Sequence, residues 1–316
     1  MIVTITLNPC IDKSTTAEKL FPEAKLRCSS MINEPGGGGI NVSKALKKLG
    51  ETATAVFPAG GHNGEMLKGL LKKEDIPFYA LPAAHETREN WVILETQTNN
   101  QYRLTFPGEN TNEETLQQVI TKLKELKPEI IVASGSLPPG LPVNAFAQIA
   151  HTAKQLNSHY VLDTSGEALR AAADVGVFLL KPNLSELSRL IGKDKLNDEE
   201  VNEAANEIIQ KGYAEAVAVS LGAGGALLVT GHFRERVIAP SVKKQSTVGA
   251  GDSMVAGMVY QLHKGKTFSE MIRLGVSCGT AATMNPGTQL FNPSDVYRLY
   301  EEINLQSGKA VTAPVS

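Results

Sequence analysis

Cysteine is scarce in this sequence, and its distribution excludes two common ways of stabilising a fold. The 316 residues include three cysteines, Cys10, Cys28 and Cys278, which lie far apart and show no CxxC spacing. An odd number of distant cysteines argues against a disulfide framework, and the missing spacing argues against a structural zinc site. The sequence therefore predicts a protein of the reducing cytoplasm.

Long hydrophobic runs and an excess of one charge are missing as well. No uninterrupted apolar segment approaches the ~18 residues that span a bilayer, and no basic region precedes the apolar N-terminal stretch. Lysine and arginine number 31 against 33 aspartates and glutamates, so the formal net charge is −2. This balance creates no bulk attraction to nucleic acid or to an anionic membrane, and we expect neither as a partner.

What the sequence does contain is an ordinary globular composition in which short apolar runs alternate with helical stretches. A buried strand is predicted at 2–7, and the apolar residues of 42–49 recur at helical spacing. Such alternation is typical of a mostly parallel sheet that helices cover on both faces. The further predicted pairs of strand and helix are 52–57 with 64–74, 129–134 with 143–156, 159–163 with 166–174, and 177–183 with 185–192.

Two segments depart from this alternation and predict a small second β-layer. Residues 12–35 and the paired runs 90–96 and 101–106 have the pattern of antiparallel strands with partly exposed faces. We interpret them as an insertion, from about 12–35 and 86–108, in one α/β domain that comprises residues 1–316. The last ten residues are small and polar, and they are predicted to fray.

The most informative stretch is QSTVGAGDSM, in which a β-like run leads through two glycines into a helix. Gly249 and Gly251 let backbone N–H groups converge at the helix start, where the helix dipole favours an anion. Asp252 lies in the first turn and faces the same point. The stretch predicts an oxyanion cradle beside a carboxylate, although the motif alone would favour Asp252 as a simple helix cap.

Two further stretches allow both a functional and a purely structural interpretation. In EPGGGGINV, four consecutive glycines permit close approach of a ligand or form a flexible turn, and Asn41 binds a sugar hydroxyl or belongs to the helix cap. In KPNLSEL, Asn183 and Glu186 share one face of a helix that begins at a strand end, where a hydrated magnesium could be held. A capping network is the alternative for this pair.

Taken together, the motifs stand in an order that resembles the ribokinase-like (PfkB) family of sugar kinases over nearly the whole chain. Five ordered motifs are far more specific than any one of them. The resemblance implies the ribokinase-like fold, a three-layer α/β sandwich with a mostly parallel central sheet and a small inserted β-sheet lid. The shared features are Asp12, GGGGINV (36–42), KPNLSE (181–186), SLGAGGAL (220–227) and TVGAGDSM (247–254).

Within that family the chain is similar to the ribokinase-type 6-phosphofructokinases of bacteria. The implied reaction is ATP-dependent phosphorylation of fructose 6-phosphate at O1, with Asp252 as the base for the acceptor hydroxyl. Positioning and charge neutralisation carry most of the catalysis in kinases of this kind, so no covalent intermediate is needed. The stretches that carry the closer similarity are PEAKLRC (22–28), EPGGGGINV (34–42), QYRLTFPG (101–108), SGSLPPG (134–140), DTSGEAL (163–169) and QSTVGAGDSM (245–254).

The resemblance also implies which residues form the site. Charge on the transferred phosphoryl group would be stabilised by Gly249, Ala250 and Gly251. The sugar would be held by Asp12, Gly37, Gly38, Asn41 and Ser136. Magnesium, through water, and the ATP phosphates would be organised by Asn183 and Glu186, and the nucleotide site would be lined by Ser220, Gly222 and Thr247. A monovalent cation such as potassium, which the family often binds, would involve Ser246, Val248, Ala282, Asn285 and Gly287.

A phosphorylated acceptor needs cations of its own, and the predicted β-layer offers Lys25, Arg27, Arg88 and Arg103. Arginine forks grip phosphate bidentately, although any one of these residues alone fits a solvated strand position better. In the enzymes that the chain resembles, Arg88 and Arg103 correspond to contacts with the substrate phosphate, and Lys25 and Arg27 lie in a lid shared between subunits. We therefore expect a homodimer in which paired lids bury an apolar face.

Two other functions compete with this interpretation. Kinases that phosphorylate fructose 1-phosphate or tagatose 6-phosphate commonly read GGKG where this chain has glycine at position 38, and the missing lysine disfavours them. A sugar-phosphate-binding regulator that has lost the chemistry is a rival of a different class. Asp252 beside an intact glycine cradle argues against it, because a pure binder needs no base there.

Overall fold

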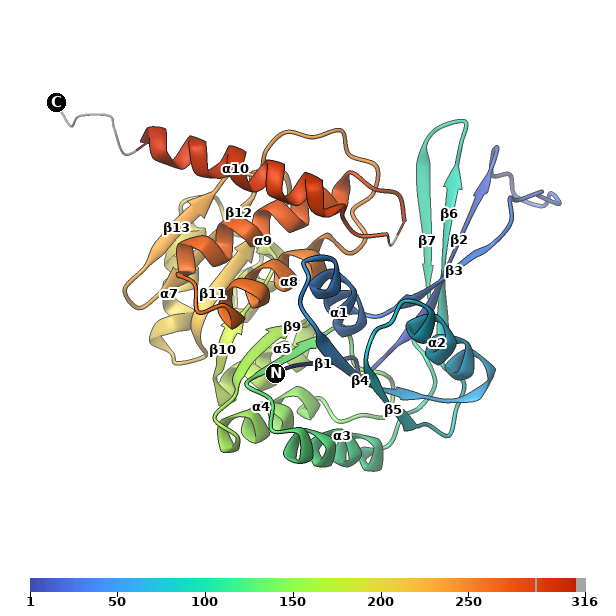
Figure 1. Ribbon diagram of the computed structural model, residues 1–316, viewed down its shortest axis with the longest axis horizontal. Helices are drawn as coiled ribbons and strands as arrows, with labels where there is room; N and C mark the ends of the chain where they lie inside the picture. The colour runs from blue at the N-terminus through green and yellow to red at the C-terminus, as the bar shows by residue number, and fades with distance from the viewer. Residues whose placement is uncertain (288, 311–316) are drawn as a thin grey trace.

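The computed structural model describes residues 1–287 and 289–310, and its core is a large twisted sheet (Figure 1). The strands of this sheet are β1 (Ile2–Ile5), β4 (Ala53–Ala59), β5 (Phe78–Pro82), β8 (Ile130–Ser134), β9 (His159–Asp163), β10 (Val177–Leu180), β11 (Ala214–Ser220), β12 (Ala226–Thr230) and β13 (Arg234–Val237). They stand in the order β13-β12-β11-β10-β9-β8-β1-β4-β5. Neighbours from β11 to β5 pair in parallel, and β12 and β13 add antiparallel strands at one edge.

Helices cover both faces of this sheet, and each face has its own hydrophobic core. The helices are α1 (Gly38–Lys48), α2 (Gly61–Lys73), α3 (Glu113–Leu126), α4 (Ala145–Gln155), α5 (Gly166–Val175), α6 (Leu184–Leu190), α7 (Glu200–Gln210), α8 (Ala250–His263), α9 (Phe268–Thr283) and α10 (Pro293–Ala310). Phe146 and Ile208 belong to the core under α3 to α7, whereas Leu46 and Val255 belong to the core under α1, α8, α9 and α10. None of the helices within the described residues is long and apolar enough to cross a membrane.

Successive residues of the central strands point to opposite cores. On β8, Ile131 and Ala133 pack under α3 to α7, while Ile130 and Val132 pack on the other side. A strand that is buried on both faces has a continuous apolar sequence, and this is why these strands were predictable. The prediction of a mostly parallel sheet covered on both faces is confirmed.

A second, four-stranded sheet projects from one end of the body (Figure 1). Its strands are β2 (Cys10–Ala17), β3 (Ile32–Gly36), β6 (Arg88–Glu95) and β7 (Asn100–Thr105), in the order β3-β2-β6-β7. The outer pairs are antiparallel, as expected, but β2 and β6 are parallel. This difference arises because β2 and β6 follow β1 and β5, which are parallel strands of the large sheet, and therefore leave the body in the same direction.

Several elements were not assigned from the sequence. They include β5 and the helices α3, α7 and α10, although Leu116, Ile120 and Leu123 of α3 show helical spacing and are buried. The predicted fraying of the last ten residues is wrong for its first part, because α10 continues to Ala310. Residues 311–316 lie outside the described part of the chain.

Candidate active site

A cleft of about 210 Å³ lies where the second sheet meets the start of α8. Its walls come from the second sheet, from the glycine-rich start of α1 and from the loop before α8. These segments are far apart in sequence, and they meet at the end of the large sheet where ligands of parallel α/β folds usually bind. The lining residues are Cys10, Asp12, Gly37, Asn41, Arg88, Asn90, Trp91, Val92, Arg103, Thr105, Val248, Gly249 and Asp252.

Asp252 is held in this cleft by two hydrogen bonds. Asn41 Nδ2 donates to Asp252 Oδ2 at 2.9 Å, and Ser134 Oγ donates to Asp252 Oδ1 at 3.1 Å. The N-cap of α8 is Gly249, and no side chain caps this helix, so Asp252 is not the cap that the motif alone would favour. Asn41 Oδ1 is buried without a hydrogen-bond partner among the described residues, which suits an oxygen that a ligand hydroxyl would satisfy.

The electrostatic surroundings of Asp252 make it an unusual carboxyl group. Burial raises the pKa of Asp252 to about 6, and the charge of Asp163 adds to the rise, while the hydrogen bond from Asn41 opposes it. Lys181 also favours the charged form and pairs with Asp163, Nζ to Oδ1, at 3.1 Å. A carboxyl group that titrates near neutrality is suited to accept a proton from an alcohol during a reaction.

The N-terminus of α8 has the geometry of the predicted anion cradle. Gly249 takes a φ of 72°, and a Cβ on it would lie 2.5 Å from Leu290 Cδ2, so glycine is required there. The first N–H groups of a helix have no intrahelical acceptor and carry the positive end of its dipole. Lys181 lies beside them, because a Cβ on Gly251 would stand 3.6 Å from Lys181 Nζ. Backbone N–H groups and an ammonium group therefore surround one point.

The glycine run of α1 packs tightly against the sheet. Gly37 has a φ of 113°, and a Cβ on it would lie 2.5 Å from Thr6 Cγ2. A Cβ on Gly38 would lie 2.2 Å from Ser134 Oγ. These contacts show that the glycines allow α1 to pack closely against the sheet, which a flexible turn would not require, and they bring the start of α1 with Asn41 to the ends of β1 and β8.

Asp12 is fixed from two sides. Asn90 Nδ2 donates to Asp12 Oδ1 at 3.0 Å, and the thiol of Cys10 donates to the same oxygen at 3.3 Å. A Cβ on Gly36 would lie 2.3 Å from Asp12 Oδ2, so this glycine makes room for the carboxylate. Burial, and secondarily the charge of Asp12, raise the pKa of the Cys10 thiol well above its usual value, which leaves it a hydrogen-bond donor.

Arg88 lines the cleft with most of its N–H groups already engaged. Its Nε and Nη2 donate to Asn8 O at 3.3 and 3.1 Å, and its Nη1 donates to Asn90 Oδ1 at 3.0 Å and to Phe106 O at 2.8 Å. The guanidinium is thus rigidly placed, and a bidentate grip on a phosphate would require some of these bonds to be exchanged.

Arg103 lies on the exposed strand β7 and reaches across to the body. Its Nη2 donates to Thr247 Oγ1 at 2.9 Å, and Nε and Nη2 also donate to Gln101 Oε1. The arginine predicted for the sugar phosphate and the threonine predicted for the nucleotide are therefore direct neighbours. Arg103 lines the cleft, and Thr247 lies in the loop just before α8.

A second groove of about 470 Å³ contains most of the predicted nucleotide residues. Asn183, Ser220 and Gly222 line it together, and Asp198 and Arg236 form an ion pair of 2.7 Å at its edge. Its lining also includes Leu184, Ser185, Leu221 and Gly224.

Asn183 and Glu186 form a capping box at the start of α6. Glu186 N donates to Asn183 Oδ1 at 2.9 Å, and Asn183 N donates to Glu186 Oε2 at 2.8 Å. The capping network is therefore present. Burial raises the pKa of Glu186, and the backbone hydrogen bond from Asn183 opposes that rise. A carboxylate has a second oxygen, so this cap does not prevent Glu186 from binding a water of a hydrated ion.

The residues predicted for a monovalent cation come from the loop before α8, from the last turn of α9 and from the loop after α9. Ser246 N donates to Thr283 O at 3.2 Å, which ties the loop before α8 to the end of α9. Val248 N donates to Ser246 Oγ, and Asn285 Nδ2 donates to Ala281 O. Ala282 lies in the last turn of α9, and Asn285 and Gly287 lie in the loop that follows. The side-chain and carbonyl oxygens of these segments are the donor type that suits such an ion.

Four residues predicted to bind the sugar phosphate do not line the cleft of their own chain, and they are Gly38, Lys25, Arg27 and Ser136. Lys25 and Arg27 are exposed in the segment between β2 and β3, and neither is among the residues that line the cleft. Ser136 is exposed and accepts a hydrogen bond from Asn8 Nδ2 at 3.3 Å, also outside that lining.

Reasoning from the sequence missed Ser134, Asp163 and Lys181, which surround Asp252. Each ends or directly follows a buried parallel strand, in β8, β9 and β10 respectively. A polar residue at the carboxyl end of such a strand is a recognisable signal, because these ends share one edge of the sheet. The three lie in the motifs SGSLPPG, DTSGEAL and KPNLSEL; other positions were chosen in the first and third, and none in the second.

Comparison with known proteins places this geometry in a family. The family model described as "pfkB family carbohydrate kinase" matches residues 2–295. The chain is 43% identical to the ATP-dependent 6-phosphofructokinase isozyme 2 of Escherichia coli over 301 residues, which are 95% of this chain and 97% of that protein. It is 34% identical to the 1-phosphofructokinase of Bacillus subtilis over 294 residues, 92% of this chain and 96% of that protein.

Solved structures show the same likeness. Crystal structures of phosphofructokinase-2 from Escherichia coli in complex with potassium and with fructose-6-phosphate match with TM-scores of 0.93 and 0.91, at 42% and 41% identity, covering 96% of this chain and 99% of each of those chains. The ribokinase of Arabidopsis thaliana, complexed with ribose and ATP, matches with a TM-score of 0.73 at 20% identity over 95% of this chain and 98% of that one. The last match shows the fold alone, and the predicted ribokinase-like sandwich is confirmed.

Proposed function

The chain belongs to the pfkB family of carbohydrate kinases, and from that membership we propose that it transfers the γ-phosphoryl group of ATP to O1 of fructose 6-phosphate. The observation that carries the proposal is Asp252, a carboxyl group with a pKa near 6 at the start of α8, directly beside the anion cradle. The similarity to a fructose-6-phosphate kinase of Escherichia coli, the highest identity among those compared above, supports the choice of substrate.

The reaction follows from the positions of these groups. Asp252 accepts the proton of the O1 hydroxyl as O1 attacks the γ-phosphorus, and the bond from that phosphorus to the β,γ-bridging oxygen breaks as ADP leaves. Negative charge on the transferred group is stabilised by the N–H groups at Gly249, Ala250 and Gly251, and by Lys181. Because Lys181 also pairs with Asp163, the ammonium group stays in place before the substrates bind.

The sugar phosphate occupies the cleft with O1 at Asp252 and its phosphate toward the second sheet. Asp12 and Asn41 bind sugar hydroxyls, and Gly37 and Gly38 allow the ring to approach the backbone. Arg88 and Arg103 provide positive charge for the phosphate at the far end. A lysine at position 38 would place its Cβ 2.2 Å from Ser134 Oγ, so this cleft does not accommodate the GGKG variant without rearrangement.

ATP occupies the groove of Asn183, Ser220 and Gly222, with its phosphates directed past Lys181 toward α8. Magnesium, held through water by Asn183 and Glu186, would neutralise phosphate charge when bound. Thr247 stands at the junction of nucleotide and sugar phosphate. Potassium would be held by oxygens of Ser246, Val248, Ala282, Asn285 and Gly287, as suggested by the potassium complex of the Escherichia coli enzyme.

The second sheet acts as a lid, and two copies of it form a homodimer. Tyr102 and Leu104 on the edge strand β7 are 42% and 44% exposed, and pairing of two lids would bury them. Lys25 and Arg27 do not line the cleft of their own chain, and in such a dimer they would reach the cleft of the neighbouring subunit. Sedimentation analysis combined with activity measurements over a dilution series tests whether the active enzyme is a dimer. A fully active monomer would contradict the proposed dimer. With Cys10 and Cys278 buried as thiols, we place the enzyme in the cytoplasm.

The substrate is tested with a coupled ADP-release assay on three phosphosugars. We expect kcat/KM for fructose 6-phosphate to exceed that for fructose 1-phosphate by at least ~10², because fixed donors in the cleft would be left unpaired. Tagatose 6-phosphate should be closer, since it differs only at C4. Equal or better use of fructose 1-phosphate would favour the activity named for the Bacillus subtilis relative, and absence of ADP release with all three would favour a regulator.

A further inference from the structure

Ser134 contacts the base but has no part in the reaction as described above. It is the last residue of β8, its side chain is 2% exposed, and its Oγ donates to Asp252 Oδ1 at 3.1 Å. We propose that Ser134 is a positioning residue that orients the Asp252 carboxylate and stabilises its charged form. The inference rests on the proposed function, because it takes Asp252 to be the base.

The position of the Ser134 hydroxyl is fixed by the packing of α1. Gly38, the first residue of that helix, lies so close that a Cβ on it would stand 2.2 Å from Ser134 Oγ and 2.7 Å from the Ser134 carbonyl carbon. Three residues later, Asn41 holds the other oxygen of the carboxylate. Donors from a strand and from a helix therefore hold one oxygen each, and a free lone pair remains on each oxygen for the acceptor hydroxyl.

The charges around Asp252 explain why such a donor is needed. Asp163 lies directly opposite Ser134 in the register of β8 and β9, and its charge disfavours ionisation of Asp252, as does burial. A hydrogen bond to the charged form works in the other direction. Ser134 and Asp163 lie at the ends of neighbouring strands and affect the pKa of Asp252 in opposite directions. The hydrogen bond from Ser134 lowers it, and the charge of Asp163 raises it. The other charged or titratable groups that face this space are Lys181, Cys10, Asp12, Arg88 and Arg103.

Ser134 neither gains nor loses a proton in the reaction. The proton of O1 moves to Asp252, the O1–phosphorus bond forms, and the bond to the bridging oxygen of ADP breaks. The serine hydroxyl keeps its own proton and donates more strongly to the carboxylate than to the carboxylic acid. Its effect is therefore on how much of the enzyme carries an ionised, oriented base at a given pH.

The test is the pH profile of kcat/KM for fructose 6-phosphate in Ser134→Ala. Loss of a hydrogen bond to a charged group should move the acidic limb to higher pH by about one unit, and much of the lost rate should return at alkaline pH. KM for ATP should change less than about twofold. An acidic limb that coincides with that of the wild type would overturn the proposal.

Ser43→Ala is the matched control. Ser43 Oγ is hydrogen bonded to Thr4 Oγ1 at 2.7 Å, is as buried as Ser134, and lies on α1 without touching Asp252. Ser43→Ala removes an equivalent buried hydroxyl, so this variant should lower stability by an amount comparable to Ser134→Ala. It should leave the acidic limb of the pH profile in place. If Ser43→Ala moved the limb equally, the effect of Ser134 would be structural and the proposal would fail.

A double-mutant cycle separates this inference from the proposed function. In an Asp252→Asn background, Ser134→Ala should alter the residual rate by less than about twofold, because the group through which it acts has been removed. A further large loss in that background would contradict the proposal. Should Asp252→Asn alone retain its rate, the assignment of the base is wrong; should it lose its rate while Ser134→Ala shows no shift, only the role of Ser134 is wrong.

Discussion

The two ends of α8 each lie beside a carboxylate, and the surroundings shift the two pKa values in opposite directions. At the N-terminus, burial and the charge of Asp163 raise the pKa of Asp252 to about 6. At the C-terminus, the hydrogen bond from Lys264, at 2.7 Å, lowers the pKa of Glu51, although partial burial opposes it. The same chemical group is therefore prepared to take up a proton at one end and to remain charged at the other.

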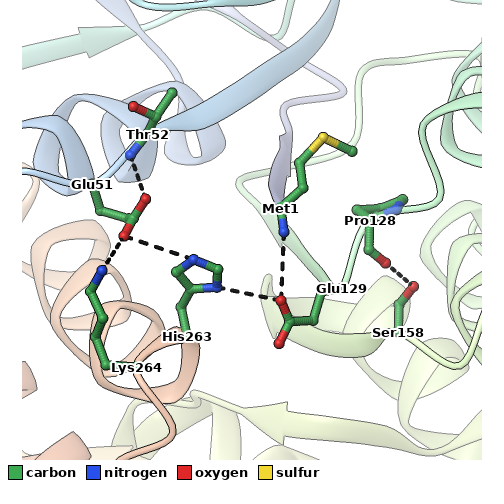
Figure 2. Close-up of polar contacts among 8 residues, drawn as sticks. All are labelled: Met1, Glu51, Thr52, Pro128, Glu129, Ser158, His263 and Lys264. Atoms are coloured by element: carbon green, nitrogen blue, oxygen red, sulfur yellow. Dashed lines mark hydrogen bonds and ion pairs between the residues drawn. The ribbon is translucent and has the colours of Figure 1, made fainter.

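The C-terminal end of α8 is a partly exposed network of ion pairs (Figure 2). His263 lies between Glu51 and Glu129, with Nε2 at 3.8 Å from the first carboxylate and Nδ1 at 3.5 Å from the second. The N-terminal amine of Met1 also pairs with Glu129 at 3.5 Å. These contacts connect the helix end with the starts of β1, β4 and β8 at the edge of the sheet opposite the cleft.

The difference shows how the surroundings of a carboxylate affect the stability of the fold. Glu51 pairs with the partly exposed Lys264, and a pair near the surface contributes about 0–1 kcal/mol. Asp252 ionises in a buried place beside another carboxylate, so its charge destabilises the folded chain at neutral pH. The environment of Asp252 thus suits the base proposed above, and it differs from that of the ion-paired Glu51.

The largest expected effect is on catalysis. Asp252→Asn should reduce kcat by at least ~10² to 10⁴, the usual range for loss of a general base, and should leave the binding of both substrates nearly intact. Glu51→Gln, at the other end of the same helix, should keep kcat within about twofold. Turnover measured by ADP release under saturating substrates checks both, and similar losses in the two variants would abolish the contrast between the ends.

A smaller effect of opposite sign is expected on stability. The pKa of Asp252 is raised in the folded state, so the folded chain binds the extra proton between about pH 4 and 6, and ionisation above this range lowers stability. Asp252→Asn should therefore be more stable than the wild type by up to about 3 kcal/mol at pH 7.5. The gain should vanish below about pH 4 in urea unfolding curves, and a gain independent of pH would contradict the explanation.

The smallest effect is expected at Glu51. Glu51→Gln should destabilise the chain by about 0.5 kcal/mol at pH 7, because the contact with Lys264 is partly exposed. The pKa of Glu51 is lowered by folding, so this stabilisation is present above the unfolded pKa and is lost as pH falls through the folded value. Unfolding curves at pH 7 and at about pH 3 should show the difference shrink. A larger difference in stability between wild type and Glu51→Gln at about pH 3 than at pH 7 would contradict a lowered pKa for Glu51.

The individual motifs were predictable because each depends on neighbours in sequence. Gly249 and Asp252 belong to one helix start, and the glycine run precedes Asn41 by a few residues, so local rules suffice to expect a cradle and a close approach. The alternation of apolar runs gave the parallel sheet for the same reason. Neighbouring residues alone could not decide whether Asp252 is a base or a helix cap, because its partners Asn41 and Ser134 are 211 and 118 residues away in sequence.

What the sequence by itself determined is therefore the set of elements and the chemical groups at their ends: a mostly parallel sheet, glycines at helix starts, and a carboxylate in the first turn of α8. Only the tertiary structure decided which of these groups meet. The strand order places the ends of β8, β9 and β10 side by side, so that Ser134, Asp163 and Lys181 surround Asp252. The physical reason is that desolvation and charge act over distances in space, whereas propensity and periodicity act along the chain.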